Sequence, residues 1–503
     1  MYEVGVRRGA CNSPGWTVCS GPILVRDATH LQGFESQLAE VALDELEVSG
    51  SIPAWLSGTL VRNGPARYEV GERTLNHWFD GLAMLHAFGF QDGRVSYANR
   101  YLQTGAHEAA TRRGRIEYSE FATDPCRSVF SRVQAMFSPS LAGGATPNAN
   151  VNVVRLGERY LALTETPLPV AFDPRTLDTL GVARDAAAPG QHATAHPHHD
   201  PDRDELVAYV VAFGPRSRYV LYAVPANGGA RRTIASLPVS RPSYMHSFAL
   251  TPRYAVLCEF PLVVNPLRLA SRARPFIENY RWDPDRPARF LVVDRQAGDL
   301  RGAYETDPFF CFHHINAFER DGNLVVDLSA YDDDEIIRAL YLDRARDPET
   351  VFPTVAPRRY EIDLDGGGVR SRRLADVMFE LPRMDYRRHN GRDYRYAYAA
   401  SLRHPGAPGF LDQLAKLDVA DESVATWHEE GCFPGEPVFV AGPHAEREDD
   451  GVLLSVVLDA RSGTSFLLAL DAGDLHELGR AQVPQHVPFG FHGSYFRSAR
   501  RFF

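Results

Sequence analysis

Lysine is almost absent from this chain. Lys416 is the only lysine among 503 residues, so arginine supplies nearly all of the positive charge. The net charge is −10 at pH 7, and no long run of Lys or Arg occurs. Proteins that bind nucleic acids draw much of their affinity from such basic clusters, because these neutralise phosphates. The composition therefore argues against nucleic acid as a partner.

Long apolar runs are missing too. No stretch approaches the roughly 18 apolar residues that indicate a membrane-spanning helix. After Arg7 and Arg8, residues of the Gly, Asn, Ser and Pro types interrupt any apolar segment, so the N-terminus does not resemble a signal peptide. The six cysteines lack CxxC spacing, which favours reduced thiols. We expect a cytoplasmic protein, with peripheral contact to a membrane surface left open.

Short apolar strands joined by Asp- or Gly-containing turns recur along most of the chain. This pattern predicts β-hairpins, for example over residues 87–97, 290–300 and 467–475. Hairpins spread over roughly 450 residues indicate an all-β fold of the β-propeller type. We predict a loosely ordered arm over residues 1–40 and a single propeller domain over residues 41–503.

One helical pattern interrupts the strands at residues 126–138. Val129, Phe130, Val133, Met136 and Phe137 fall on one face of a helix. Such a helix packs on the sheet core or, alternatively, lies at a substrate entrance or on a membrane surface. The apolar segment 260–267 leaves the same alternatives open.

Four histidines stand in short apolar or aromatic frames that no helical HExxH or zinc-finger spacing explains. Imidazole is a common ligand of iron, copper, nickel and zinc. Ligands drawn from across most of a chain suggest a metal site on the axis of a closed, radially symmetric fold. The four frames contain His196 (AHP), His246 (YMHSF), His313 (CFHHIN) and His492 (GFHG).

Two of these frames hold competing histidines. His198 and His199 follow His196, and His314 follows His313. Pro197 restrains His196 to extended geometry, which favours it as a ligand at a strand end. Elsewhere, three histidines in polar surroundings are predicted to lie at the surface: His30, His428 and His476.

Three glutamates have frames suited to supporting such a site: Glu165, Glu380 and Glu436. Each stands among apolar residues or among Pro and Gly, where an unpaired carboxylate would be costly. Carboxylates commonly accept the second ring N–H of a metal-bound histidine and orient it. We expect these three to lie directly behind the ligands.

Residues 58–65 (GTLVRNGP) and 77–81 (HWFDG) resemble the N-terminal signature of the carotenoid cleavage oxygenases, a family of non-haem iron enzymes. The resemblance runs from about Ile52 to Phe496 and includes all four histidine frames and all three glutamate frames. Residues 124–127 (DPCR) are similar to the PDPCK motif of the branch that contains the animal β-carotene oxygenases and the retinoid isomerase. Thr123 and Arg127 depart from that motif.

The resemblance implies a seven-bladed β-propeller with a dome of helices and loops over its top face. It also implies one Fe(2+) per subunit, bound by His196, His246, His313 and His492. Glu165, Glu380 and Glu436 would support these ligands. No catalytic residue is expected beyond this metal site.

The implied activity is that of a dioxygenase whose co-substrate is O2. It would cleave a double bond of a carotenoid or apocarotenoid to aldehydes, with central cleavage of β-carotene to retinal as the leading expectation. The alternatives are a retinoid isomerase or isomerohydrolase that uses the same iron site, or a carotenoid-binding propeller without catalysis.

Overall fold

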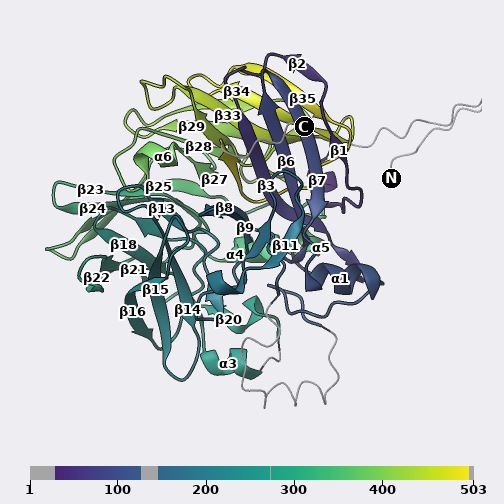
Figure 1. Ribbon diagram of the computed structural model, residues 1–503. Helices are drawn as coiled ribbons and strands as arrows, with labels where there is room; N and C mark the ends of the chain where they lie inside the picture. The colour runs from purple at the N-terminus through teal and green to yellow at the C-terminus, as the bar shows by residue number, and fades with distance from the viewer. Residues whose placement is uncertain (1–28, 126–145, 272–273, 498–503) are drawn as a thin grey trace, which may run out of the picture.

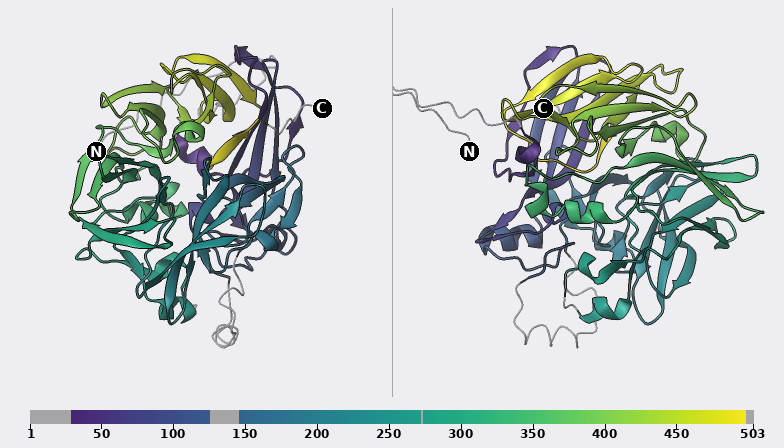
Figure 2. Two further views of the ribbon diagram at one scale, coloured as in Figure 1. Left: turned by 60° about the vertical axis from the view of Figure 1, so that its left-hand side comes forward. Right: turned by 180° about the vertical axis from the view of Figure 1, so that it is seen from behind.

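The computed structural model describes residues 29–125, 146–271 and 274–497. Seven antiparallel sheets of four to six strands are arranged in a ring around a central axis (Figures 1 and 2). The expected seven-bladed β-propeller is thereby confirmed.

Five of the blades each use one continuous part of the chain. The first comprises β8 (Asn152–Leu156), β9 (Arg159–Leu163), β10 (Val170–Phe172) and β11 (Thr179–Val182). The second comprises β12 (His192–Ala193), β13 (His198–Asp200), β14 (Glu205–Ala212), β15 (Ser217–Pro225) and β16 (Arg232–Val239). The third comprises β17 (Ala249–Leu250), β18 (Tyr254–Glu259), β21 (Ala288–Asp294) and β22 (Asp299–Thr306). The fourth comprises β23 (His314–Arg320), β24 (Asn323–Ala330), β25 (Ala356–Asp363) and β26 (Val369–Arg373). The fifth comprises β27 (Glu380–Arg383), β28 (Tyr396–Ser401), β29 (Gln413–Asp418) and β30 (Ser423–His428).

The other two blades close the ring by exchanging strands between the two ends of the chain. One comprises β1 (Ala42–Leu43), β3 (Gly58–Arg67), β6 (Leu82–Gln91), β7 (Arg94–Tyr101) and the C-terminal β36 (Gly493–Phe496). The other comprises the N-terminal β2 (Val48–Gly50) with β31 (Cys432–Pro434), β32 (Val438–Ala441), β33 (Gly451–Asp459), β34 (Thr464–Asp471) and β35 (Glu477–Val483). Pairing of β36 with β3 and of β2 with β35 covers strand edges that would otherwise be open.

The predicted hairpins are confirmed. β6 pairs with β7, β21 with β22, and β34 with β35, all antiparallel. In the first hairpin, Asp92 and Gly93 have φ angles of +51° and +79°. Two successive positive φ values belong to the type I′ turn, whose twist matches that of paired strands.

Short helices lie at both ends of the ring. At one end, η2 (Trp78–Asp80) and α4 (Glu335–Ala339) contribute to the wall of an apolar cavity; at the other, α6 (Tyr386–His389) contributes to a polar one. The remaining short elements are η1 (His30–Phe34), α1 (Gly105–Arg112), η3 (Arg184–Ala186), α3 (Pro266–Ser271), η4 (Ile277–Asn279), α5 (Leu342–Ala345), β4 (Glu69–Val70) with β5 (Arg73–Thr74), and β19 (Leu262–Val264) with β20 (Tyr280–Trp282). No helix among the described residues is long and apolar enough to span a membrane.

The largest apolar cluster joins the propeller to η2 and α4 at the apolar-cavity end of the ring, which we call the cover. It contains Tyr209 and Phe290 from the blades together with Trp78 and Ile336 from the cover. Burial of one large apolar side chain contributes about 1.5–3 kcal/mol. The cover is therefore held by the same core that stabilises the blades.

The predicted N-terminal arm is too long at its C-terminal boundary. η1 packs into the main cluster, and Phe34 is fully buried. His30, predicted to lie at the surface, is only 5% exposed. Its ring lies beside Phe34 of the same helix and among the rings of Phe352, Phe410 and Phe433, which distant parts of the chain supply. His428 and His476 are exposed, as predicted.

The two ambiguous apolar segments have different outcomes. The predicted helix over residues 126–138 lies outside the described residues. In the segment 260–267, Phe260 and the strand β19 are buried, and Leu267, 74% exposed, is the large apolar side chain that faces solvent. Most of this segment therefore belongs to the core.

Candidate metal centre

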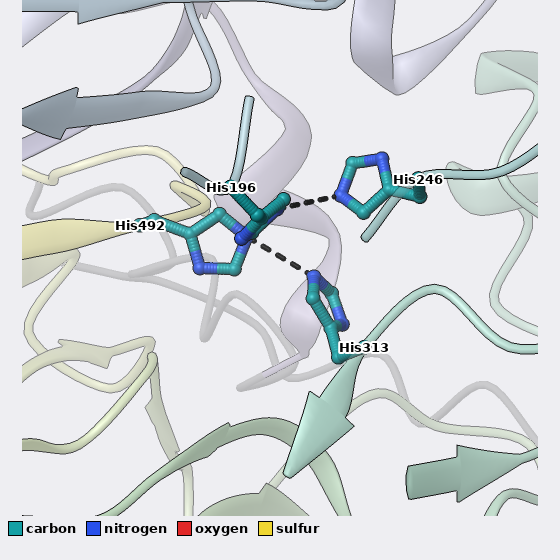
Figure 3. Close-up of side chains that lie close together, drawn as sticks. All are labelled: His196, His246, His313 and His492. Carbon is teal, nitrogen blue, oxygen red and sulfur yellow. Dashed lines mark hydrogen bonds between the residues drawn. The ribbon is translucent and has the colours of Figure 1, made fainter. Parts of the chain in front are cut away.

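The four predicted histidines meet at the centre of the ring, and each comes from a loop or strand start facing the axis. His196 lies between β12 and β13, and His246 precedes β17; His313 and His492 immediately precede β23 and β36. One ligand atom from each ring lies within 4.8 Å of the others. Figure 3 shows the rings pointing toward a common centre.

The Nε2 atoms form this centre. The distance between Nε2 of His196 and Nε2 of His246 is 2.9 Å, and that between Nε2 of His313 and Nε2 of His492 is 3.1 Å. The rings of His196 and His492 lie almost at right angles, at 85°. Four imidazoles in this arrangement surround one small volume from different directions.

Carboxylates fix three of these rings from behind. Glu165 lies 2.7 Å from Nδ1 of His246, Glu380 lies 2.6 Å from Nδ1 of His313, and Glu436 lies 2.7 Å from Nδ1 of His492. A carboxylate only accepts hydrogen bonds, so each Nδ1 must carry the proton. The Nε2 lone pairs are then directed at the centre without a proton, an arrangement that suits a cation.

Each carboxylate also accepts hydrogen bonds from other groups. The hydroxyl of Tyr244 donates to Glu165 at 3.0 Å, and the hydroxyl of Tyr331 donates to Glu380 at 3.0 Å. Glu436 accepts the backbone N–H of Gly493 at 3.0 Å and is paired with the guanidinium of Arg62. These bonds leave the carboxylates little freedom to turn away from the histidines.

The electrostatics keep the acids charged and favour the neutral form of His246 and His492. Burial alone would raise the pKa of Glu165, Glu380 and Glu436, but neighbouring imidazoles, and for Glu436 also two guanidinium groups, hold each pKa below its ordinary value. Burial lowers the pKa of His492 to about 4 and also lowers the pKa of His246. The rings of His246 and His492 are thus available as neutral ligands at neutral pH.

His196 differs from the other three histidines. It is half-buried, and no carboxylate among the described residues bonds its ring. Its backbone N–H donates to Oγ1 of Thr194 at 3.0 Å, which fixes the main chain before Pro197. Burial, followed by the other three imidazoles, holds the pKa of His196 well below its ordinary value.

The competing histidines point elsewhere. His198 bonds Oδ1 of Asn390 and the carbonyl oxygen of Phe248, at 3.0 and 2.9 Å. His199 lies at the surface, 3.2 Å from Asp204. The hydroxyl of Ser247 donates to a carbonyl, so Nδ1–H of His314 must donate to that hydroxyl, at 2.8 Å. The structure therefore gathers His196 and His313 at the centre and leaves their neighbours outside it.

An apolar cavity of about 890 Å³ opens on one side of the centre. It touches His246, His313 and His492, and Glu165 and Glu380 are its charged wall residues beside them. The rest of the wall is almost entirely apolar and includes Trp78, Phe79, Phe121, Phe312, Phe410 and Phe491. An apolar molecule fits this lining and would lie beside the histidines.

A second cavity, which we call the axial channel, reaches the centre from the end of the ring that carries α6. It touches His196, His313 and His492 and has about 1870 Å³ of empty space. Its wall is mainly polar and includes Asn152, Ser247, His314, Arg383, Asn390 and Glu436.

Several supporting residues were missed from the sequence. Tyr244 and Arg62 stand inside the motifs that were recognised, beside His246 and within residues 58–65, yet neither motif indicates their contacts. Arg383 lies 3.5 Å from Glu436, and Tyr331 lies in a stretch with no distinguishing pattern. These contacts join residues far apart in the chain, so spacing offers no signal for them.

Comparison with known proteins agrees with this geometry. The family model described as retinal pigment epithelial membrane protein matches residues 34–497. The mitochondrial carotenoid-cleaving dioxygenase of Macaca fascicularis is 36% identical over 512 residues, which cover 89% of this chain and 91% of that protein. The chain belongs to the carotenoid cleavage oxygenase family.

Other members of the family show similar coverage. The β,β-carotene 15,15′-dioxygenase of Rattus norvegicus is 33% identical, over 90% of this chain and 89% of that protein. The carotenoid isomerooxygenase of Galleria mellonella is 35% identical, over 92% and 95%. The crystal structure of cobalt-substituted Synechocystis apocarotenoid oxygenase superimposes with a TM-score of 0.82 at 29% identity, over 93% of this chain and 98% of that one. The predicted family and class of enzyme are confirmed, and the family is metal-dependent.

Proposed function

We propose that this protein is an Fe(II)-dependent dioxygenase whose metal ligands are His196, His246, His313 and His492. The observation that carries the proposal is the convergence of four imidazoles, three of them with Nδ1 bonded to a carboxylate. Three carboxylates lie behind these ligands and offset the positive charge of a ferrous ion, while Glu436 also faces the guanidinium groups of Arg62 and Arg383. Carboxylate support of this kind orients ligands and raises their basicity.

Ferrous iron, when bound, supplies the electrons that make dioxygen reactive toward a carbon–carbon double bond. The chain's own residues position and protect the reactants. Phe79, Phe312 and Phe491 line the cavity beside the histidines and exclude water from the polyene. Glu165 and Glu380 hold His246 and His313 in place at the edge of the same cavity.

The substrate that we propose is a carotenoid or apocarotenoid, cleaved by O2 into two aldehydes. Central cleavage of β-carotene would add one oxygen atom to each half of the molecule and give two molecules of retinal. The cavity supports this choice because a long polyene offers only apolar surface and π faces. Related proteins named as carotenoid-cleaving and β-carotene dioxygenases support it as well.

Product analysis under labelled dioxygen tests the reaction. Purified protein is incubated with β-carotene or an apocarotenal under ¹⁸O2, and the products are separated and weighed by mass spectrometry. We expect labelled aldehydes, with retinal from β-carotene. Products without label, or rearranged polyenes of unchanged carbon number, would instead support isomerisation and refute cleavage.

Metal analysis tests the cofactor and its ligands. Protein purified without oxygen should contain about one iron per chain. The variant His313→Ala should lose iron and turnover, whereas His199→Ala should keep both, since His199 lies at the surface against Asp204. Iron-free protein with full activity would contradict the proposed centre.

We further propose that the protein works in the cytoplasm and takes its substrate from a membrane surface by peripheral contact. A carotenoid dissolves in bilayers, so an enzyme whose described helices do not span one has to meet it at the surface. Flotation with liposomes tests this contact. Protein that stays at the bottom of the gradient, with and without carotenoid in the liposomes, would refute it.

A further inference from the structure

Two cavities reach the four histidines, one from each end of the propeller axis. The proposed reaction accounts for the apolar cavity, which would hold the polyene. It assigns nothing to the axial channel, although that channel touches His196, His313 and His492. A large opening to the centre of a rigid propeller calls for an explanation of its own.

The wall of the axial channel suits a hydrated cation. Its mouth carries His199, Asp204 and Glu158, whose side chains are 52%, 77% and 95% exposed. Farther in, Asn390 and Ser247 add polar side chains to the wall, where Oδ1 of Asn390 bonds His198 and Oγ of Ser247 bonds His314. Imidazole and carboxylate groups of this kind are ligands of divalent metal ions.

The arginines of the wall do not reverse this character. Arg155 is paired with Glu158 at 2.9 Å, and Arg383 lies 3.5 Å from Glu436. Arg387 is exposed to solvent, where water and salt screen its charge.

The free-energy cost of taking an ion out of water distinguishes the two routes to the four histidines. Moving a singly charged ion from water into an apolar medium costs of order 20 kcal/mol, and a divalent ion costs more. The aromatic and aliphatic wall of the apolar cavity offers few polar atoms until Glu165 and Glu380. A metal ion that enters the folded protein must therefore come through a polar passage.

His196 is the ligand best placed to meet such an ion. It is the one of the four that lines the axial channel and is absent from the wall of the apolar cavity. It is also half-buried, whereas His246, His313 and His492 are 4–8% exposed. Without a carboxylate partner among the described residues, its ring is the least restrained.

We propose that the axial channel is the path by which the metal ion enters and leaves the folded protein, and that His196 is the first of the four histidines to bind it. This inference rests on the proposed role of those histidines as ligands. It assigns separate routes to the two reactants: the ion comes through the channel and the polyene through the apolar cavity.

Uptake of cobalt by metal-free protein tests the path. Folded apo-protein is mixed with Co²⁺, the reaction is stopped with EDTA after timed intervals, and protein-bound cobalt is counted by elemental mass spectrometry. Val154 and Leu411 are a matched pair of half-buried aliphatic residues, one lining the channel and the other lining the apolar cavity. Each is replaced by tryptophan, which narrows one route and leaves the other open.

We expect Val154→Trp to slow cobalt uptake and release at least tenfold and to leave the final stoichiometry near one per chain. Leu411→Trp should take up cobalt at the rate of the unmodified protein but bind carotenoid more weakly. Leu206→Trp narrows the channel from the neighbouring blade and serves if Val154→Trp does not fold. Circular dichroism and thermal unfolding check the fold of each variant.

Three results would overturn the inference: equal uptake rates in all variants, slower uptake in Leu411→Trp alone, or cobalt that enters only during refolding. Failure of the underlying metal centre looks different. In that case neither folded nor refolded protein would bind cobalt near one per chain, and His196→Ala would change nothing.

Discussion

Replacing Glu436 with glutamine separates two functions of one carboxylate. Glu436 is fully buried and lies 2.7 Å from Nδ1 of His492. It also accepts the N–H of Gly493, pairs with Arg62 and lies 3.5 Å from Arg383. Glutamine keeps the shape but removes the charge, so it weakens support of the metal ligand and leaves two guanidinium groups without their acid.

The structure gives different magnitudes for these two effects. Removing one partner of a buried ion pair costs about 3–5 kcal/mol, and the side chain of Arg62 is only 6% exposed. Glu165→Gln is the matched control because Glu165 supports His246 in the same way and bonds Tyr244, and no arginine among the described residues pairs with it. Its loss of hydrogen bonds to a charged group should cost about 1–3 kcal/mol. Both variants should bind metal about 10–100-fold more weakly.

Urea unfolding of the metal-free variants measures the first effect, and competition for Co²⁺ measures the second. We expect the two variants to differ in free energy of unfolding but to be similar in metal affinity. Adding Arg62→Met to the Glu436→Gln variant should restore part of the lost stability, because the buried guanidinium of Arg62, which has lost its acid, is then removed as well. Equal losses of stability in Glu436→Gln and Glu165→Gln would refute the reasoning.

Two further predictions concern buried titratable side chains away from the metal centre. Burial lowers the pKa of His30 to about 4, so the folded protein keeps this ring neutral where the unfolded chain takes up a proton. The contribution of His30 to the free energy of unfolding is complete above its ordinary pKa of 6.5 and falls as the pH drops toward 4. Between pH 7 and pH 5 the apo-protein should lose about 2 kcal/mol of stability through this group. Urea unfolding at the two pH values should show a correspondingly smaller loss of stability for apo-protein with His30→Phe. An unchanged pH dependence in that variant would contradict the burial of a neutral ring. Nζ of Lys416 lies 2.6 Å from Asp449, and both side chains are 7% exposed, so Lys416→Met should cost about 3–5 kcal/mol. The double variant Lys416→Met, Asp449→Leu should be more stable than Lys416→Met alone. If it is not, the unpaired carboxylate of Asp449 is not what destabilises the single variant.

The hairpins were predictable because their signals are local. Asp92 and Gly93 fit a turn that needs two positive φ angles, and the residues on either side alternate as paired strands require. The number of blades was not readable from these repeats, which are too degenerate to count. It followed from family resemblance, and closure by β2 and β36 depends on pairing between the two ends of the chain.

The candidate site was predictable as a set of residues but not as an arrangement. The frames of His246 and His492 each hold one histidine, whereas the frames of His196 and His313 hold neighbours that local patterns cannot rank. Successive side chains of an extended segment point in opposite directions, so His313 faces the axis and His314 faces away. The contact of His314 with Ser247, 67 residues away, shows which way each one points.

By itself, the sequence determined the strands, the turns and the side chains able to bind and support a metal, because these depend on neighbours along the chain. Only the tertiary structure decided which charges and rings meet. Arg62 reaches Glu436 across 374 residues, and His30 is buried among phenylalanines from four parts of the chain. The physical reason is that the environment of a side chain, and hence its pKa and partners, is set by closure of the propeller, which brings together residues that no local pattern relates.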